Sequence, residues 1–184
     1  MARRFTRILV PTDFGTASES AVACAKDLAA KFNARLLLLH IVEDPTATGV
    51  WMPEVYIAAS AELRDTLLRD ARQKLESALT AEERERFIAS TEVRTGTAAE
   101  AIGAFAREKG VDLIVMGTHG RRGLAHMFLG SVAERVVRTA PCPVLTVRGD
   151  RRTQEVSDDA PAVREDNAPP KPRAEANFSQ APDA

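Results

Sequence analysis

The sequence has neither an excess of charge of one sign nor a long apolar run. Its 184 residues carry 25 basic and 26 acidic side chains, so bulk electrostatics indicate neither nucleic acid nor a membrane surface as a partner. The apolar run Leu36–Val42 is far too short to cross a bilayer and is read as a buried strand. The basic N-terminus is followed by only a short apolar run, Ile8 to Val10, which cannot form the core of a signal peptide.

Cysteine is also scarce. Cys24 and Cys142 are the two cysteines of the chain, and both lie in apolar helix or strand patterns without metal-ligand spacing. We therefore expect small buried hydrophobic side chains rather than a disulfide, redox or metal role. A reducing compartment is the usual setting for such a chain, so we expect a cytoplasmic protein.

Strand patterns and helix patterns alternate along the chain. The predicted strands are Arg7–Pro11, Leu36–Val42, Thr91–Thr95, Leu113–Met116 and Pro143–Val147. The predicted helices run from Thr16 to Asn33, from Ala61 to about Phe87, from Thr97 to Gly110 and from Gly130 to Thr139. This alternation predicts an α/β fold with an open, mostly parallel five-stranded sheet that helices cover on both faces.

Three further features complete this outline. Thr16 with Glu19, and Thr97 with Glu100, have the spacing of capping boxes. Residues 43–59 lack periodicity and are expected to form a long connection. Residues 148–184 hold half of the prolines and lack Leu and Ile, so we predict one domain over 1–147 and a disordered, charged, proline-rich tail over 148–184.

Two strand ends carry the residues that are most suggestive of a ligand site. The first strand leads into Asp13, and the fourth leads into Gly117, Thr118, His119 and Gly120. In open α/β sheets, ligands bind beyond the carboxyl ends of strands, where the strand order reverses. If the two strands are neighbours, the Asp13 carboxylate faces the glycines and suits ribose hydroxyls. Alternatively, Asp13 only turns or caps the chain before the next helix, and position alone does not separate the two interpretations.

The sequence lacks the common phosphate-loop patterns. There is no Gly-x4-Gly-Lys-Ser/Thr, and no Gly-x-Gly-x-x-Gly follows the first strand, which disfavours a P-loop hydrolase and a standard dinucleotide dehydrogenase. Instead, Gly117-x2-Gly120-x9-Gly130-Ser131 ends at a predicted helix start. Glycines allow backbone N–H groups to approach a phosphate, and a helix start carries partial positive charge. The motif therefore predicts a nucleotide or another phosphate ligand.

Catalytic and metal-binding groups are not evident near this motif. His119 and His126 lie in a predicted loop, and no Cys or acidic residue joins them, so we predict no metal site in the protein. No base, nucleophile or acid cluster stands out, so we predict no catalytic residue. Binding is favoured over catalysis, and any enzymatic activity is expected to be weak.

With these residues identified, the sequence resembles the universal stress protein family, in its ATP-binding subgroup, over about residues 3–147. The likeness extends from RILVPTDFG through the glycine motif to GSVAERVVRTAPCPVLTV. The glycine motif matches the nucleotide-binding signature of the family without a gap, and Asp13 matches its acidic position. The resemblance implies a Rossmann-like three-layer sandwich, similar to adenine nucleotide alpha hydrolases, with strand order 3-2-1-4-5.

The resemblance also implies a ligand and the residues that bind it. The ligand would be ATP, with Mg²⁺ held mainly by the phosphates. The residues implied for adenine and ribose are Pro11, Thr12, Asp13 and Val42; those for ribose and phosphates are Met116, Gly117, His119, Gly120 and Arg121; those for the phosphate tail are Gly130, Ser131 and Val132.

The resemblance further implies a homodimer formed through the last strand. Val144–Val147 is the last strand in the chain and is expected at a sheet edge, whose unpaired backbone groups favour pairing with a second copy. The expected function is a nucleotide-dependent regulatory dimer in the stress response. The alternatives are a slow ATPase or adenylyl-transferring enzyme, and a nucleotide-independent interaction or chaperone-like module.

Overall fold

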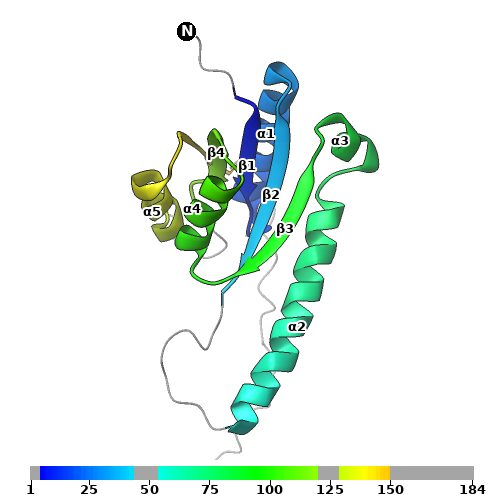
Figure 1. Cartoon of the computed structure of the whole chain (residues 1–184), viewed down its shortest axis with the longest axis vertical. Helices are drawn as coiled ribbons and strands as arrows, with labels where there is room; N and C mark the ends of the chain where they lie inside the picture. Colours follow the sequence, from blue (N-terminus) through cyan, green and yellow to red (C-terminus); the bar gives the residue numbers. More distant parts are fainter. Residues whose placement is uncertain (1–4, 44–53, 120–128, 150–184) are drawn as a thin grey trace, which may run out of the picture.

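A five-stranded parallel sheet forms the centre of the protein (Figure 1). The computed structural model describes residues 5–43, 54–119 and 129–149, and only the backbone of residues 54–61. The strands are β1 (Arg7–Pro11), β2 (Arg35–Val42), β3 (Ser90–Thr95), β4 (Leu113–Gly117) and β5 (Val144–Val147), and their order is β3-β2-β1-β4-β5. The predicted α/β class, parallel pairing and strand order are confirmed.

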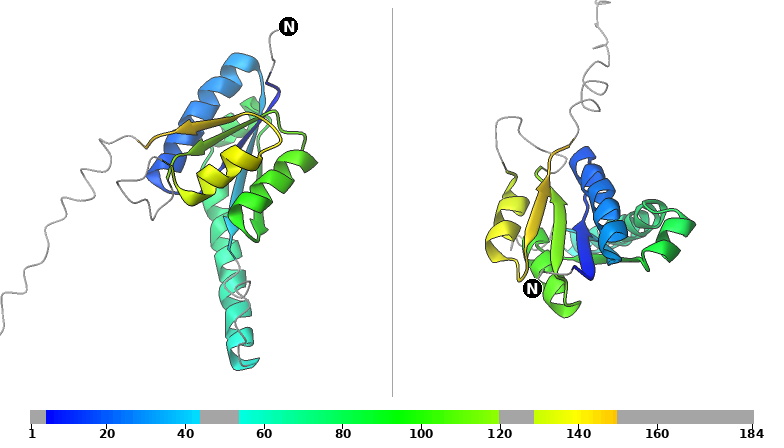
Figure 2. Two further views of the ribbon diagram at one scale, coloured as in Figure 1. Left: turned by 90° about the vertical axis from the view of Figure 1, so that its left-hand side faces the viewer. Right: turned by 90° about the horizontal axis from the view of Figure 1, so that it is seen from above.

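Helices cover both faces of this sheet. The first face packs against α1 (Thr16–Phe32) and α2 (Glu54–Ser77), and the second against α4 (Ala98–Glu108) and α5 (Ser131–Thr139). The short helix α3 (Ala81–Arg86) follows α2 in the chain and has no buried residue. Seen from above in Figure 2, α1 and α5 lie on opposite sides of β4 and β5. Within the described ranges, no helix combines the length and apolar character needed to cross a bilayer.

Strand alternation divides the core into two clusters. Ile8 of β1 and Leu38 of β2 pack towards α1, whereas their neighbours Leu9 and Leu39 pack towards α4 and α5. These side chains are fully buried, as expected for parallel strands covered on both faces. The two cysteines follow the same division: Cys24 packs partly buried against the first cluster, and Cys142 against the second.

The prediction of one helix from Ala61 to about Phe87 is wrong. The structure has two helices there: α2 begins at Glu54 and ends at Ser77, and α3 begins at Ala81. Thr80 separates them with a capping box, in which Glu83 N donates to Thr80 Oγ1 at 3.2 Å and Thr80 N donates to Glu83 Oε2 at 2.9 Å. The apolar periodicity continues through Leu79, which is buried, and therefore conceals the break. The predicted connection 43–59 overlaps the start of α2, and its residues 44–53 lie outside the described residues.

The predicted ends of two helices are confirmed, whereas the two predicted capping boxes are not. Asn33 ends α1 in the left-handed conformation at φ 51°, and Gly110 follows α4 at φ 58°. However, the N-cap of α1 is Gly15 rather than Thr16, and Thr97 caps α4 without a side-chain hydrogen bond. Both predicted capping boxes are therefore wrong: Thr16 lies inside α1 instead of at its cap, and Thr97 is at the cap of α4 but its hydroxyl makes no capping hydrogen bond.

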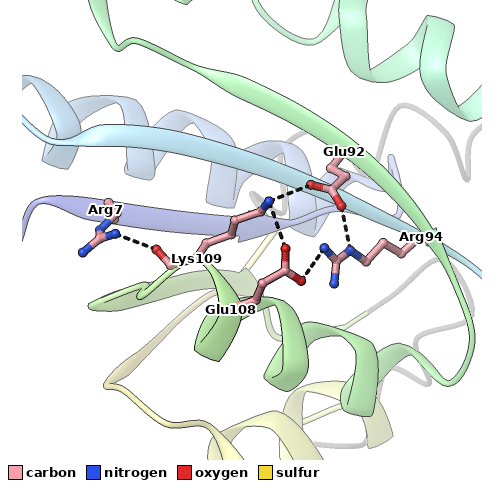
Figure 3. A network of polar contacts seen from close by, with 5 residues as sticks. All are labelled: Arg7, Glu92, Arg94, Glu108 and Lys109. Carbon is pink, nitrogen blue, oxygen red and sulfur yellow. Dashed lines mark hydrogen bonds and ion pairs between the residues drawn. The ribbon is translucent and has the colours of Figure 1, made fainter.

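A charged cluster joins the edge strand β3 to the carboxyl end of α4 (Figure 3). Arg94 Nε lies 2.7 Å from Glu92 Oε1 and its Nη2 lies 2.6 Å from Glu108 Oε2, while Lys109 Nζ lies 3.0 Å from Glu108 Oε1. The hydrogen bond to Glu92 raises the pKa of Arg94, and the hydrogen bonds from Arg94 and Lys109 lower the pKa of Glu108. Both cations also lie over the Phe105 ring, so the cluster holds α4 against the sheet.

Candidate functional site

A cavity of about 760 Å³ opens at the carboxyl ends of β1, β2 and β4. In the sheet, β2 and β3 lie on one side of β1, and β4 and β5 lie on its other side, so the direction of strand addition reverses between β1 and β4. The cavity therefore lies at the switch point, where open α/β sheets bind ligands. Its volume falls within the range of about 300–1,000 Å³ that is typical of small-molecule sites.

The cavity collects most of the residues that the sequence singles out. Its lining includes Pro11, Thr12, Asp13, Val42, Met116, Gly117, His119, Gly130, Ser131 and Val132. Gly120 and Arg121 lie outside the described residues, as does the predicted tail apart from Arg148 and Gly149. Residues that are far apart in the sequence thus meet at one cavity.

The turn between β1 and α1 presents Asp13 to this cavity. Gly15 N donates to Asp13 Oδ1 at 3.1 Å, and Phe14 N donates to Thr12 Oγ1 at 3.0 Å. Asp13 therefore turns the chain before α1, as one of the two interpretations expected, and it also lines the cavity. Because an ionised carboxylate can accept several hydrogen bonds, the two interpretations are compatible.

The start of α5 also borders the cavity. Gly130 is the N-cap of α5, and a glycine has no side chain that could cap the first N–H groups of the helix. Gly130 N donates to Thr118 O at 2.7 Å, and Thr118 N donates to Val147 O at 2.8 Å, so the helix start is fixed to the ends of β4 and β5. The first-turn N–H groups of a helix have no intrahelical acceptor. At Ser131 and Val132 they border the cavity and favour an anion there.

Gly117 has a packing role in addition to the ligand role that the motif predicts. A Cβ atom at this position would lie 2.8 Å from Ala17 C and 2.9 Å from Ala17 Cβ. These distances are shorter than real Cβ contacts, and the obstacle is the backbone of α1. The absence of a side chain at Gly117 therefore allows α1 to pack on β4, whether or not a phosphate also approaches this residue.

An apolar wall of the cavity was missed by the sequence reasoning. It consists of Leu39, Ile41, Ala98, Ile102 and Ala133, which join the predicted Met116. Ile41 packs against the core cluster of α4 and α5, as Met116 does, whereas the predicted Val42 follows it on β2. Strand alternation from Leu39 could have identified Ile41, because residues two apart face the same side.

A second wall was missed because it comes from a distant helix. Leu67, Asp70, Ala71 and Lys74 of α2 border the cavity beside Phe14. Lys74 Nζ lies 5.9 Å from the Phe14 ring centroid. In the sequence these residues read as a helix with a solvated face, and no local pattern indicates that α2 reaches the carboxyl ends of β1 and β2. Among the residues that the structure describes, no group of three potential metal ligands is found.

The sheet order and the position of the cavity define the class of protein. This is a three-layer, Rossmann-like α/β protein with a ligand-sized cavity at the switch point. The chain belongs to the universal stress protein family, because residues 4–148 match the model of that family.

Individual relatives agree with this assignment. The chain is 36% identical to the universal stress protein MJ0531 of Methanocaldococcus jannaschii over 149 residues, which cover 80% of this chain and 85% of the relative. It is also similar to the solved structure of MJ0577 from the same organism, with 29% identity, a TM-score of 0.70 and coverage of 80% and 99%. A universal stress protein solved in complex with cAMP matches with 27% identity, a TM-score of 0.50 and coverage of 80% and 100%.

Proposed function

We propose that this protein binds ATP and acts as a nucleotide-dependent regulatory dimer in the stress response. The observation that carries the proposal is one cavity with Asp13 at one side and the start of α5 at another. A carboxylate suits ribose hydroxyls, and a helix amino terminus suits phosphates. The relative that binds cAMP supports an adenine nucleotide as the ligand.

The proposed pose follows from the chemistry of the walls. The adenine lies against the apolar wall that contains Ile41 and Met116, beside Val42, Pro11 and Thr12. The ribose lies at Asp13, and the phosphates extend past Gly117 and His119 to Gly130, Ser131 and Val132. Gly120 and Arg121 are proposed at the same phosphate end on sequence grounds, and Mg²⁺ is proposed to be held mainly by the phosphates.

A charge substitution at the start of α5 tests this pose. In Ser131→Glu, an exposed residue at the first helical position receives a carboxylate, which the helix dipole favours. The fold is therefore expected to remain stable, while the new charge repels the triphosphate. We expect the affinity for ATP, measured by isothermal titration calorimetry with Mg²⁺, to fall at least about tenfold, because juxtaposed like charges are costly.

A matched control separates repulsion from a general effect of the added charge. Ala81→Glu places the same carboxylate at the first position of α3, whose residues do not border the cavity. ATP affinity is expected to stay within about twofold of wild type, a difference smaller than 1 kcal/mol. Failure of the wild-type protein to bind ATP, or equal affinities of Ser131→Glu and Ala81→Glu, would contradict the proposal.

The proposed dimer forms through β5. This strand ends the sheet, and Leu145 on it and Val137 on the adjacent α5 expose 38% and 48% of their surface. A second copy that pairs with β5 satisfies its outer backbone groups and covers these side chains. We expect sedimentation velocity to report a dimer for wild type and a shift to monomer for Leu145→Glu; a monomeric wild type would refute this part of the proposal.

A further inference from the structure

The turn that carries Asp13 has an unfavourable backbone conformation. Phe14 has φ 62°, in the left-handed region that bulky residues rarely adopt. Such a residue persists only where surrounding interactions fix it, and these positions gather at functional sites. The contacts around Phe14 therefore determine how firmly its neighbour Asp13 is held.

Several of these contacts come from the turn itself. Thr12 Oγ1 accepts from Phe14 N at 3.0 Å and lies 3.0 Å from Ser18 Oγ, which also donates to Gly15 O at 2.8 Å. Thr12 and Ser18 are both buried. Two short polar side chains, Thr12 in the turn and Ser18 in the first turn of α1, thus stabilise this conformation.

His40 holds the same turn from the neighbouring strand. Its Nδ1 lies 2.8 Å from the carbonyl oxygen of Thr12, and because a carbonyl oxygen only accepts, Nδ1 must carry the proton. The imidazole also packs on the Phe14 ring, with 4.5 Å between centroids and an interplanar angle of 32°. One side chain of β2 therefore fixes the residue before Asp13 and the residue after it.

The placement of His40 separates it from the apolar wall. Side chains alternate along β2: Ile41 packs with the cluster of α4 and α5, while Leu36 and Leu38, two and four residues before His40, pack with the cluster of α1. The imidazole thus shares the face of Phe14 and Lys74, and all three residues border the cavity. Ile41 and Met116 of the wall proposed for adenine pack on the other face of the sheet, so the contact that links His40 to Asp13 is its hydrogen bond with the Thr12 carbonyl.

We propose that His40 is a positioning residue for ribose recognition, which directs the Asp13 carboxylate by holding the Thr12 carbonyl and the Phe14 ring. The inference rests on the proposed ATP site and adds to it a residue that determines selectivity for the ribose hydroxyls. It requires the Nδ1 donor of His40 to the Thr12 carbonyl, with the ring contact to Phe14 as a secondary support, and not merely a side chain of suitable volume.

The decisive readout is the ratio of the affinities for ATP and for 2′,3′-dideoxy-ATP, which lacks the ribose hydroxyls. Hydrogen bonds to a charged group are comparatively strong, so wild type is expected to prefer ATP by about tenfold or more. His40→Leu removes the donor and is expected to reduce this ratio to within about twofold of unity. His40→Asn keeps an N–H donor near the Nδ1 position and is expected to restore most of the preference.

Two further variants exclude a merely structural role. Val22→Ala loosens the core cluster on the same face at a residue that takes no part in the hydrogen bonds of the turn given above, so it is expected to lower the melting temperature and leave the ratio unchanged. In Asp13→Asn the preference is expected to be weak already, and adding His40→Leu is expected to change it no further, because both changes remove one coupled interaction.

The outcomes distinguish this inference from the proposed function. If wild type binds neither nucleotide, the ATP site itself is refuted. If wild type prefers ATP and His40→Leu keeps the full preference, the ATP site stands and the role of His40 is overturned. The role of His40 is also overturned, with the ATP site intact, if His40→Asn lowers the ratio as much as His40→Leu does, or if Val22→Ala lowers it to the same extent.

Discussion

Gly117→Ala is expected to destabilise the protein although it adds only one methyl group. The new Cβ would lie 2.8 Å, 2.9 Å and 3.0 Å from the carbonyl carbon, the Cβ and the carbonyl oxygen of Ala17. Two of these atoms are backbone atoms of α1, which cannot turn aside as the end of a long side chain can. Overpacking of this kind typically costs about 1–3 kcal/mol, which corresponds to a fall of roughly 2–12 °C in the melting temperature of a chain of this size.

The control for this prediction is another glycine of the same domain. A Cβ at Gly103 in α4 would lie 3.7 Å from Arg107 Nη1, the end of a long side chain, and alanine favours a helix by about 0.5–1 kcal/mol over glycine. Gly103→Ala is therefore expected to be neutral or stabilising in thermal and urea unfolding. Equal stability of Gly117→Ala and wild type would refute the reasoning and would return Gly117 to a role in ligand binding alone.

The remaining predictions concern a helix cap and ion pairs. Thr80→Ala removes the capping box of α3 and is expected to lower the free energy of urea unfolding by about 0.5–2 kcal/mol; an unchanged value would contradict the cap. The pKa of Glu83 is lowered, first by its hydrogen bond with Lys26, so its stabilisation is present above the ordinary pKa of a glutamate and is lost as the pH falls through the lower folded value. In Lys26→Met, the free energy of urea unfolding is expected to depend less on pH below pH 5 than in wild type. An unchanged pH dependence would argue against the Lys26–Glu83 ion pair. The pKa of Glu108 is likewise lowered by Arg94 and Lys109, and nuclear magnetic resonance titration is expected to show it rise towards its ordinary value in Arg94→Met.

The parts of the fold that the sequence predicts best are those with strong periodicity. The run Leu36–Leu39 reads as a strand covered on both faces, and the structure buries all of it between two helical layers. The break at Thr80 was missed because Leu75 and Leu79 continue the same apolar stripe and both are buried. The Thr80–Glu83 spacing was readable, but equal spacings at Thr16 and Thr97 form no box, so the spacing alone does not discriminate.

The candidate site divides in a similar way between local and distant features. Asp13 comes shortly after β1, and Gly130 comes directly before α5. Their place at the carboxyl edge of the sheet could therefore be predicted from the strand order. Lys74 and Phe14 meet only because α2 passes the ends of β1 and β2, which no local pattern encodes. The close approach of Gly117 to Ala17 also joins distant segments, and for this reason the motif predicts a phosphate role for Gly117 but not its packing role.

The central claim is that an adenine nucleotide occupies the cavity at the switch point. Backbone amide shifts in two-dimensional nuclear magnetic resonance spectra, recorded during a titration with ATP and Mg²⁺, test it most directly. The largest changes are expected at Asp13, Thr118, Ser131 and Val132, around both ends of the cavity. An unchanged spectrum, or changes confined to the far end of the sheet around Asp112, would contradict the account.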